Sequence, residues 1–288
     1  MAFLIYFGSM GQICFNGKFL PISGPVLRVD NRGFRYGDGL FETIKIWQGK
    51  MLLEQLHFER LFSSLSILKY EVPIFFIQKK IKEEILKLCQ VNKVDKQARV
   101  RISVFRGNGG LYDEDSSLQY IIECWPLNES VNRLNENGLV IDIFPVARKS
   151  ADLFSNLKSA NFLPYSMAAL YAMENKLNDC LVLNTDGYVA DSTIANVFLI
   201  NDEIIKTPDL SQGCVSGVMR KHLIATLKEG GFEVRETQIS DTDLEMADEL
   251  FLTNAINGIR WVRQFREKTY SHQKTMEIYN RFVKTVFC

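Results

Sequence analysis

The stretch CLVLNTDGYVADSTIANVFLI, residues 180–200, decides how this chain folds. Its two apolar runs are rich in β-branched and aromatic residues, and Asp186-Gly187 between them favours a tight hairpin turn. The stretch therefore predicts a strand, a turn and a second strand. Asp191 lies between the second strand and a polar turn. An acid in such a place usually caps the local backbone, so this stretch alone indicates no function.

Upstream, the stretch NLKSANFLPYSMAALYA, residues 156–172, places Lys158 between a strand-like and a helix-like segment. A lysine held rigidly among small and apolar neighbours loses hydration, and this lowers its pKa toward the neutral amine that carbonyl chemistry needs. The alternative is a solvated lysine at a helix start, and the local sequence alone favours that alternative.

Downstream, the segment QGCVSGVMR leads into the start of a helix and contains Gly213 and Gly217. Backbone N–H groups and the helix dipole favour an anion at such a start. In the first half, His57 and Arg60 of HFERL lie three residues apart and share a helix face. The planar guanidinium of arginine suits a phosphate.

Strand and helix patterns mix in both halves of the chain. Hairpins are predicted in 12–22 and 39–53, helices in 52–70, 74–89, 216–231 and 272–287, and single strands in 97–107, 119–125, 139–147 and 247–259. The elements do not alternate regularly as in a dinucleotide-binding sheet, and no GxGxxG segment is present. The pattern predicts a mixed α/β (α+β) fold.

With 288 residues the chain is long enough for two domains. The polar, turn-rich segment that begins PLNESVNRLNEN predicts a linker at 126–137. A small N-terminal α/β domain is expected at 1–125 and a larger C-terminal domain at 138–288.

Composition and charge exclude several classes. The chain has 34 basic and 34 acidic residues, which argues against nucleic acid or an anionic membrane as a partner. Six scattered cysteines and three histidines without ligand spacing predict no metal site and fit a reducing compartment. The N-terminal MAFLIYFGSMG lacks the basic region of a signal peptide, and no run reaches the ~18 apolar residues of a membrane helix. A cytoplasmic protein is expected.

Together, a reactive lysine, an acid and two candidate phosphate sites are the parts that a pyridoxal phosphate (PLP) site needs. The order of these segments resembles the fold-type IV PLP enzymes, the class IV aminotransferase family of branched-chain and D-amino-acid aminotransferases and aminodeoxychorismate lyase. The resemblance extends from FNGKF to about Val262. Its motifs are RGFRYGDGLFET, HFERL, LKSANFL, DGYVADSTIANVFLI, TPDLSQGCVSGVMR and ELFLTNA.

The resemblance implies that Lys158 is the catalytic residue, which forms a Schiff base with PLP. It implies that Asp191 holds the ring nitrogen, although the family usually has the longer glutamate there. The implied cofactor contacts are Arg60, Lys158, Asp191, Asn196, Ser216, Gly217, Val218, Met219, Asn254 and Ala255. The resemblance also implies a homodimer, with the cofactor at the interface of two domains.

Several residues favour the lyase branch of the family. Thr43 and Phe162 differ from the glycine and tyrosine of branched-chain enzymes, and Ala255 lacks the hydroxyl of their Thr-Gly-Thr. Phe41 stands where the D-amino-acid enzyme has a carboxylate-binding tyrosine. TPDLSQGCVSGVMR and FRGNGGLYD resemble the lyase versions of these segments.

The expected function is therefore 4-amino-4-deoxychorismate lyase, which acts on a small-molecule amine and releases pyruvate and 4-aminobenzoate in folate synthesis. An aminotransferase of branched-chain L-amino acids, or of D-amino acids, with a 2-oxo acid acceptor is the alternative. A PLP-binding protein without catalysis is more remote. The candidates for substrate contact are Arg35, Phe41, Arg106, Tyr112 and Asn257.

Overall fold

The structure is a computed structural model that describes residues 11–113 and 117–287. The N-terminal segment on which the expectation of no signal peptide rests lies almost wholly outside the described residues. The described chain forms two compact units. The first is Met1–Leu127 with Ser159–Asn161, and the second is Asn128–Lys158 with Phe162–Cys288. Lys158 thus belongs to the second unit, and the three residues after it belong to the first.

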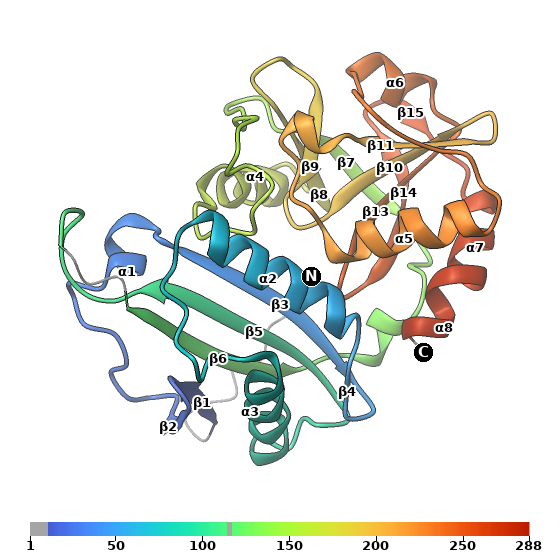
Figure 1. Cartoon of the computed structure of the whole chain (residues 1–288). Helices are drawn as coiled ribbons and strands as arrows, with labels where there is room; N and C mark the ends of the chain where they lie inside the picture. Colours follow the sequence, from blue (N-terminus) through green and yellow to red (C-terminus); the bar gives the residue numbers. More distant parts are fainter. Residues whose placement is uncertain (1–10, 114–116, 288) are drawn as a thin grey trace. The chain divides into compact units, whose positions relative to one another are not determined.

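A six-stranded antiparallel sheet organises the first unit, in the order β2-β1-β6-β5-β3-β4 (Figure 1). Its strands are β1 (Gln12–Phe15), β2 (Lys18–Pro21), β3 (Gly39–Trp47), β4 (Lys50–Met51), β5 (Gln97–Arg106) and β6 (Leu118–Pro126). Both predicted hairpins are confirmed. The turn residues Asn16-Gly17 and Gln48-Gly49 all have positive φ, as a tight two-residue turn requires.

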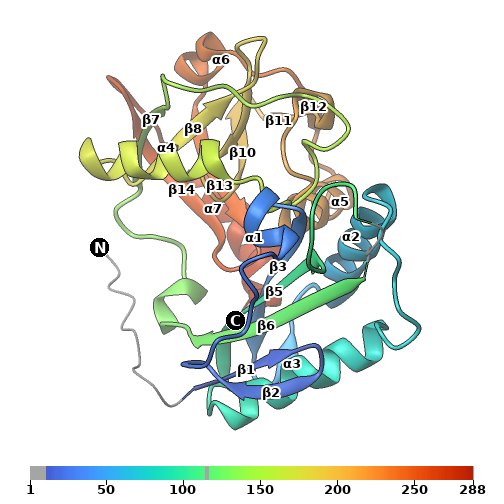
Figure 2. The ribbon, with the colours of Figure 1, turned by 90° about the vertical axis from the view of Figure 1, so that its left-hand side faces the viewer.

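Helices cover one face of this sheet: α2 (Glu54–Ile67) packs against β3, and α3 (Gln78–Val91) packs against β1 and β6 (Figures 1 and 2). The short α1 (Arg32–Tyr36) lies beside β5. The predicted alternation of β5 is confirmed, because Ala98, Val100, Ile102 and Val104 are all fully buried. The helix predicted from residue 74 begins only at Gln78, because Ile77 has extended backbone with ψ 151°.

A nine-stranded mixed sheet organises the second unit, in the order β12-β11-β10-β13-β14-β7-β8-β9, with β15 beside β14. Its strands are β7 (Leu139–Ile143), β8 (Asp179–Leu183), β9 (Val189–Ser192), β10 (Asn196–Asn201), β11 (Ile204–Pro208), β12 (Val234–Thr237), β13 (Glu249–Asn254), β14 (Gly258–Phe265) and β15 (Lys268–Thr269).

The stretch 180–200 forms three strands, and the prediction of two was wrong. The ladder is interrupted after β9, where Ser192 N–H donates to the Ala195 carbonyl and Ser192 Oγ accepts from Ala195 N–H. These local bonds turn the chain, so that β10 pairs with β11 and β13 and not with β8.

The helices of the second unit are α4 (Leu163–Glu174), α5 (Val218–Glu229), α6 (Asp241–Met246), α7 (Gln273–Ile278) and α8 (Lys284–Phe287). α4 packs against β8 and α5 against β13 (Figure 2). The predicted C-terminal helix is confirmed, with a π-helical turn at Tyr279–Val283. A strand-like segment was expected directly before Lys158, but the structure has a loop there. The preceding strand, β7, ends at Ile143. Within the described part of the chain, no helix combines the length and apolar character needed to cross a membrane.

Candidate active site

Asp191 is the centre of a buried hydrogen-bond cluster in the second unit. Its Oδ2 accepts from the Tyr165 hydroxyl at 2.7 Å, from Val215 N–H at 2.9 Å and from Lys149 Nζ at 3.2 Å. Its Oδ1 accepts from Asn196 Nδ2 at 2.9 Å. The residue is 2% exposed, so these four donors replace the water that the carboxylate has lost.

The turn between β9 and β10 explains why Asp191 and Asn196 meet. Asp191 lies near the end of β9, and Asn196 begins β10 after a three-residue turn. The Asn196 amide also donates to the Val215 carbonyl at 2.8 Å. One amide group therefore joins the carboxylate to the loop before α5, and two residues predicted for the site are in contact.

The N-terminus of α5 lies directly after this loop. Gly217 is the N-cap residue, and no side chain of the described residues caps this end, so the first N–H groups of the helix at Val218 and Met219 have no side-chain acceptor among them. A Cβ added to Gly217 would lie 1.8 Å from Asn196 Oδ1. Only glycine fits this close approach. An uncapped start of a twelve-residue helix is a suitable site for a phosphate.

The loop that carries Lys158 is tied to the same region. Lys158 is half-buried, and its Nζ lies 5.9 Å from the centroid of the Phe162 ring. Asn156 donates through Nδ2 to the carbonyls of Leu210 and Cys214 at 2.8 and 2.7 Å, and its own carbonyl accepts from Ser216 N–H at 2.9 Å. The lysine segment and the predicted phosphate segment are therefore bonded to each other.

Tyr165 and Lys149 are members of this cluster that the sequence analysis missed. Tyr165 lies one helical turn after Phe162, and the two rings are 4.6 Å apart. Burial, together with the charge of Asp191, raises the pKa of Tyr165 well above its ordinary value, so the hydroxyl stays protonated and donates. Tyr165 lies three residues after Phe162 of the Lys158 segment, and this helical spacing could have indicated Tyr165 as a member of the site. No motif or period indicates Lys149.

The end of β13 supplies further polar groups. Thr253 is the cross-strand partner of Asn196, and its buried Oγ1 has no hydrogen-bond partner among the described residues. Asn254 Oδ1 accepts from the N–H groups of Ile256 and Asn257, so those backbone donors are used inside the turn. Ala255 adds no hydroxyl. The Thr253 hydroxyl and the Asn254 amide nitrogen are therefore the side-chain donors here.

These groups fit pyridoxal phosphate. Asp191 Oδ1 accepts one hydrogen bond from the described chain, and a carboxylate oxygen can accept two, so it can also bind a protonated ring nitrogen. The uncapped N-terminus of α5 and the buried Thr253 hydroxyl offer donors for a phosphate. Lys158 supplies the amine.

Arg60, the predicted phosphate ligand, belongs to the first unit and is held by a buried carboxylate. Its Nε and Nη2 donate to Glu42 Oε1 and Oε2 at 2.7 and 2.5 Å, and His57 Nδ1 lies 2.6 Å from Oε2. The prediction that His57 and Arg60 share one helix face is confirmed, because both reach Glu42 on β3. Burial alone would raise the pKa of Glu42, but the charges and hydrogen bonds of Arg60 and His57 outweigh it and lower the pKa to about 2.

Glu42→Gln is expected to destabilise the protein by about 3 kcal/mol at pH 7, because it leaves Arg60 without its buried counter-charge. The folded pKa lies below the ordinary value of 4.5, so the carboxylate stabilises the fold fully above that pH and progressively less toward pH 2. In urea unfolding, the wild type should therefore have a higher free energy of unfolding than Glu42→Gln, and this difference at pH 3 should be less than half of the difference at pH 7. A partly exposed carboxylate gives the control, because Glu54→Gln removes only the ion pair with Lys82. A difference in free energy of unfolding that is equal at both pH values would contradict the expectation.

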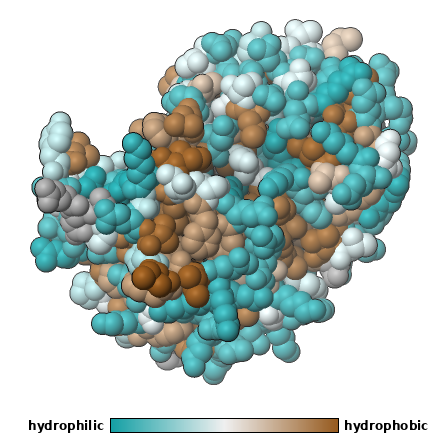
Figure 3. Space-filling view, in the orientation of Figure 1, coloured by the Kyte–Doolittle hydropathy of each residue, from teal (hydrophilic) through white to brown (hydrophobic). Residues whose placement is uncertain are grey.

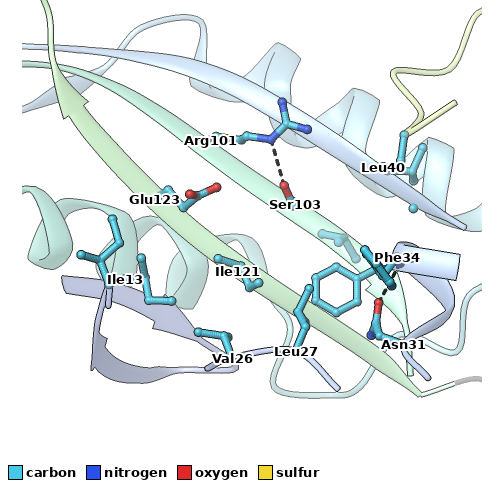
Figure 4. Close-up of a pocket in the computed structure, with 16 residues that line it drawn as sticks. Ile13, Val26, Leu27, Asn31, Phe34, Leu40, Arg101, Ser103, Ile121 and Glu123 are labelled. Atoms are coloured by element: carbon cyan, nitrogen blue, oxygen red, sulfur yellow. Dashed lines mark hydrogen bonds between the residues drawn. The ribbon is translucent and has the colours of Figure 1, made fainter. Parts of the chain in front are cut away.

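A cavity of about 400 Å³ lies in the first unit, lined by residues of β3, β5 and β6 and by the segment before α1 (Figure 4). Its polar wall is Arg101, Ser103 and Glu123. Arg101 Nε donates to Ser103 Oγ at 3.0 Å, and Glu123 is the cross-strand partner of Arg101. The Arg101 guanidinium lies 3.7 Å from the centroid of the Phe41 ring.

On this face of the sheet, burial lowers the pKa values of Arg99 and Arg101 and raises that of Glu123. Lys45 is the cross-strand partner of Arg99 and lies on the same face, so cationic side chains outnumber the glutamate there. A partly desolvated guanidinium is a strong binding group for a carboxylate.

The candidates for substrate contact lie in different surroundings. Phe41 is buried against Arg101, whereas Tyr112 is 99% exposed. Arg35 is exposed on α1 and donates to the Val29 carbonyl at 3.2 Å. In the second unit, Asn257 Oδ1 accepts from Arg260 Nη2 at 3.1 Å.

Arg106 is held by contacts within the first unit. Its Nη1 donates to Asp38 Oδ1 at 2.6 Å, and its Nη2 donates to the Leu68 carbonyl. The guanidinium also lies 4.3 Å from the centroid of the Tyr70 ring. These contacts join the end of β5 to the residues after α2. A substrate contact by Arg106 stays a prediction.

Comparison with known proteins establishes the family. Residues 39–265 match the family described as amino-transferase class IV, and the chain belongs to this family. Its members are PLP-dependent transaminases or lyases, so the protein is an enzyme of that class with a mixed α/β, fold-type IV structure.

Relatives of nearly equal identity to this chain are named for different activities. The chain is 30% identical over 269 residues to the aminodeoxychorismate lyase of Bacillus subtilis, covering 91% of this chain and 89% of that protein. It is 29% identical over 269 residues to a putative branched-chain-amino-acid aminotransferase of Methanocaldococcus jannaschii, covering 93% and 92%. It is also similar in structure to a putative 4-amino-4-deoxychorismate lyase from Legionella pneumophila, with a TM-score of 0.81, 26% identity and coverage of 90% and 95%.

Proposed function

We propose that the protein is a 4-amino-4-deoxychorismate lyase, which forms pyruvate and 4-aminobenzoate for folate synthesis. The observation that carries this choice is the polar wall of the cavity in the first unit, formed by Arg101, Ser103 and Glu123. The substrate of the lyase has two carboxylates, and a partly desolvated arginine pairs well with one of them. A branched aliphatic side chain would bring no anion to the same guanidinium.

Chain connectivity favours a role for this cavity in the reaction. Ala160 lines the cavity, and Lys158 is two residues earlier in the chain.

Lys158 and the cofactor have defined parts in the proposed reaction. When bound, PLP supplies an electron sink for the carbanion that forms at the substrate carbon. Lys158 would bind the cofactor, and as a free amine it would take the proton from the carbon beside the substrate nitrogen. The C–O bond to the enolpyruvyl group would then break as the substrate ring becomes aromatic, and the departing enolpyruvate would take up a proton to give pyruvate.

The other residues hold the cofactor in place. Asp191 Oδ1 accepts the hydrogen bond of the ring nitrogen, and Asn196 fixes that oxygen. The N–H groups at the start of α5, from Val218 and Met219, bind the phosphate together with the Thr253 hydroxyl. Arg60, expected at the phosphate from the family resemblance, adds the positive charge. Ser216, Asn254 and Ala255 are the remaining cofactor contacts of this proposal.

An aminotransferase of branched-chain L-amino acids is the second candidate, and D-amino acids are a further class of substrate. Two observations favour it: the relative from Methanocaldococcus jannaschii at 29% identity and the apolar remainder of the cavity. That apolar lining includes Ile13, Val26, Leu27, Phe34 and Ile121 (Figure 4). In that reaction Lys158 would return the proton to the cofactor, and a 2-oxo acid would accept the amino group.

Pyruvate release from 4-amino-4-deoxychorismate without any 2-oxo acid acceptor tests the proposal. Arg101→Met should lower kcat/KM for this release by about 10- to 100-fold, because it removes a charged hydrogen-bond donor to the substrate carboxylate. Arg235→Met is the control, since Arg235 pairs with the exposed Glu233 in the second unit. Wild-type protein that releases no pyruvate but consumes L-leucine with 2-oxoglutarate would establish the aminotransferase instead.

We further propose a homodimer and a cytoplasmic location. The side chains of Leu163, Met167, Leu170 and Met173 are exposed along one face of α4, and apolar side chains gather over this helix in Figure 3. Such a stripe is typical of a surface that a second copy covers. The five described cysteines are free, as in a reducing compartment. A monomer in sedimentation equilibrium, or secretion in cell fractionation, would contradict these two points.

A further inference from the structure

Lys149 is a largely buried cation to which the proposed reaction assigns no part. Its side chain is 10% exposed, and Nζ lies 3.2 Å from Asp191 Oδ2 and 5.2 Å from the centroid of the Tyr165 ring. Its N–H donates to the Leu183 carbonyl at 2.8 Å, and its carbonyl accepts from Thr185 N–H at 3.1 Å. The backbone of Lys149 is therefore fixed to the β8–β9 hairpin, with the ammonium group directed at the carboxylate.

The charge of Lys149 matters because of where Asp191 lies. A carboxylate out of water is costly unless a cation compensates it, and neutral donors satisfy its hydrogen bonds without cancelling its charge. The donors from Tyr165, Asn196 and Val215 are neutral. Among the described residues, the ion pair of Asp191 is with Lys149.

We propose that Lys149 is the counter-ion of Asp191. Before the cofactor binds, the ammonium group of Lys149 compensates the negative charge of this carboxylate. After binding, the ammonium group and the protonated ring nitrogen share one negative charge. The sharing of charge with the ring nitrogen rests on the proposed function, whereas the pairing of Lys149 with Asp191 concerns the protein without cofactor.

The ammonium group of Lys149 and the protonated ring nitrogen share the one negative charge of Asp191, so each weakens the binding of the other. The direction in which removal of Lys149 changes PLP binding follows from this. Removal of Lys149 leaves the buried carboxylate uncompensated in the cofactor-free protein, and a protonated ring nitrogen then restores part of the compensation. Loss of the lysine should therefore destabilise the cofactor-free form more than the loaded form. By linkage, the variant should bind PLP more tightly than the wild type. A lysine that merely supported the local structure would give weaker binding when removed.

Thermal unfolding of Lys149→Met, with and without PLP, tests the proposal. The cofactor-free variant should lose about 5 °C or more in Tm, and the loaded variant distinctly less. Lys149→Arg keeps the charge and should retain most of the stability. Lys206→Met is the matched control, because Lys206 forms an ion pair with Asp243 in the same unit at 3.7 Å. Its Tm loss should be small and equal in both forms.

Cofactor binding supplies a readout that distinguishes charge from packing. The Kd of Lys149→Met for PLP should fall by about tenfold. An analogue with C–H in place of the ring nitrogen should show no such gain, since it cannot carry the positive charge. A rise in Kd for both compounds would overturn the sharing of charge.

A double-mutant cycle in the cofactor-free protein tests whether Lys149 is the counter-ion of Asp191. Asp191→Asn removes the charge that Lys149 compensates, so Lys149→Met should cost much less in that background than in the wild type. Equal costs in both backgrounds would overturn the proposal. If PLP does not raise the Tm of the wild type, the proposed function fails, and this cycle still decides whether the two residues are coupled.

Discussion

Lys158→Ala is expected to abolish the release of pyruvate from 4-amino-4-deoxychorismate, with a fall in kcat of at least about 10³-fold. The variant loses the amine that attaches the cofactor and the base that takes the substrate proton, and each of these roles accounts for a large factor. The measurement is a coupled assay of pyruvate with PLP-loaded protein and no 2-oxo acid acceptor. Lys158 is half-buried in a loop, so the fold should tolerate the truncation and thermal unfolding should change little.

Lys228→Ala is the matched control for this experiment. Lys228 lies on α5 in the same unit, half exposed, with Nζ 3.7 Å from Glu236. Its removal should leave the rate unchanged. Borohydride should fix the cofactor to the tryptic peptide that contains Lys158 in the wild type and in Lys228→Ala, but not in Lys158→Ala. A Lys158→Ala protein that kept a tenth of the wild-type rate would exclude the lysine as the base.

The parts of the fold that were predictable from sequence depend on local rules. The hairpin at Asn16-Gly17 follows from a residue pair that accepts positive φ, and the buried face of β5 follows from strict alternation. The break between β9 and β10 was not predictable in this way. It depends on bonds between Ser192 and Ala195, and on distant strands that compete for β10.

The same division applies to the site. Asp191, Asn196 and Gly217 lie in motifs, and the structure brings these three into contact. Lys149 and Tyr165 reach the same carboxylate from 42 and 26 residues away in sequence. No local period encodes such contacts, since they arise only when the loop after β7 and the helix α4 pack against β8 and β9. Residues that support a motif are thus harder to predict than the motif itself.

Gly217→Ala is expected to raise the Kd for PLP by at least about 100-fold and to lower the stability by about 2 kcal/mol. The backbone of Gly217 has φ −67° and ψ 134°, which alanine adopts without strain, so the effect is purely steric. The new Cβ would lie 1.8 Å from Asn196 Oδ1 and 3.0 Å from its Cγ. Asn196 must therefore move, and it then loses its bonds to Asp191 Oδ1 and to the Val215 carbonyl. One methyl group thus displaces both the ring-nitrogen acid and the loop that leads into the phosphate-binding helix start.

Gly231→Ala separates this effect from a general loss of stability. Its Cβ would meet no atom within 4 Å, but its φ of +84° is unfavourable for alanine, so the variant should lose about 1–2 kcal/mol and keep the wild-type Kd for PLP. Asn196→Ala gives the second comparison. It removes the atom that clashes, so Gly217→Ala should destabilise the Asn196→Ala protein much less than the wild type. Isothermal titration with PLP and urea unfolding measure both quantities. If Gly217→Ala lost stability but bound PLP as tightly as the wild type, the start of α5 would not hold the phosphate.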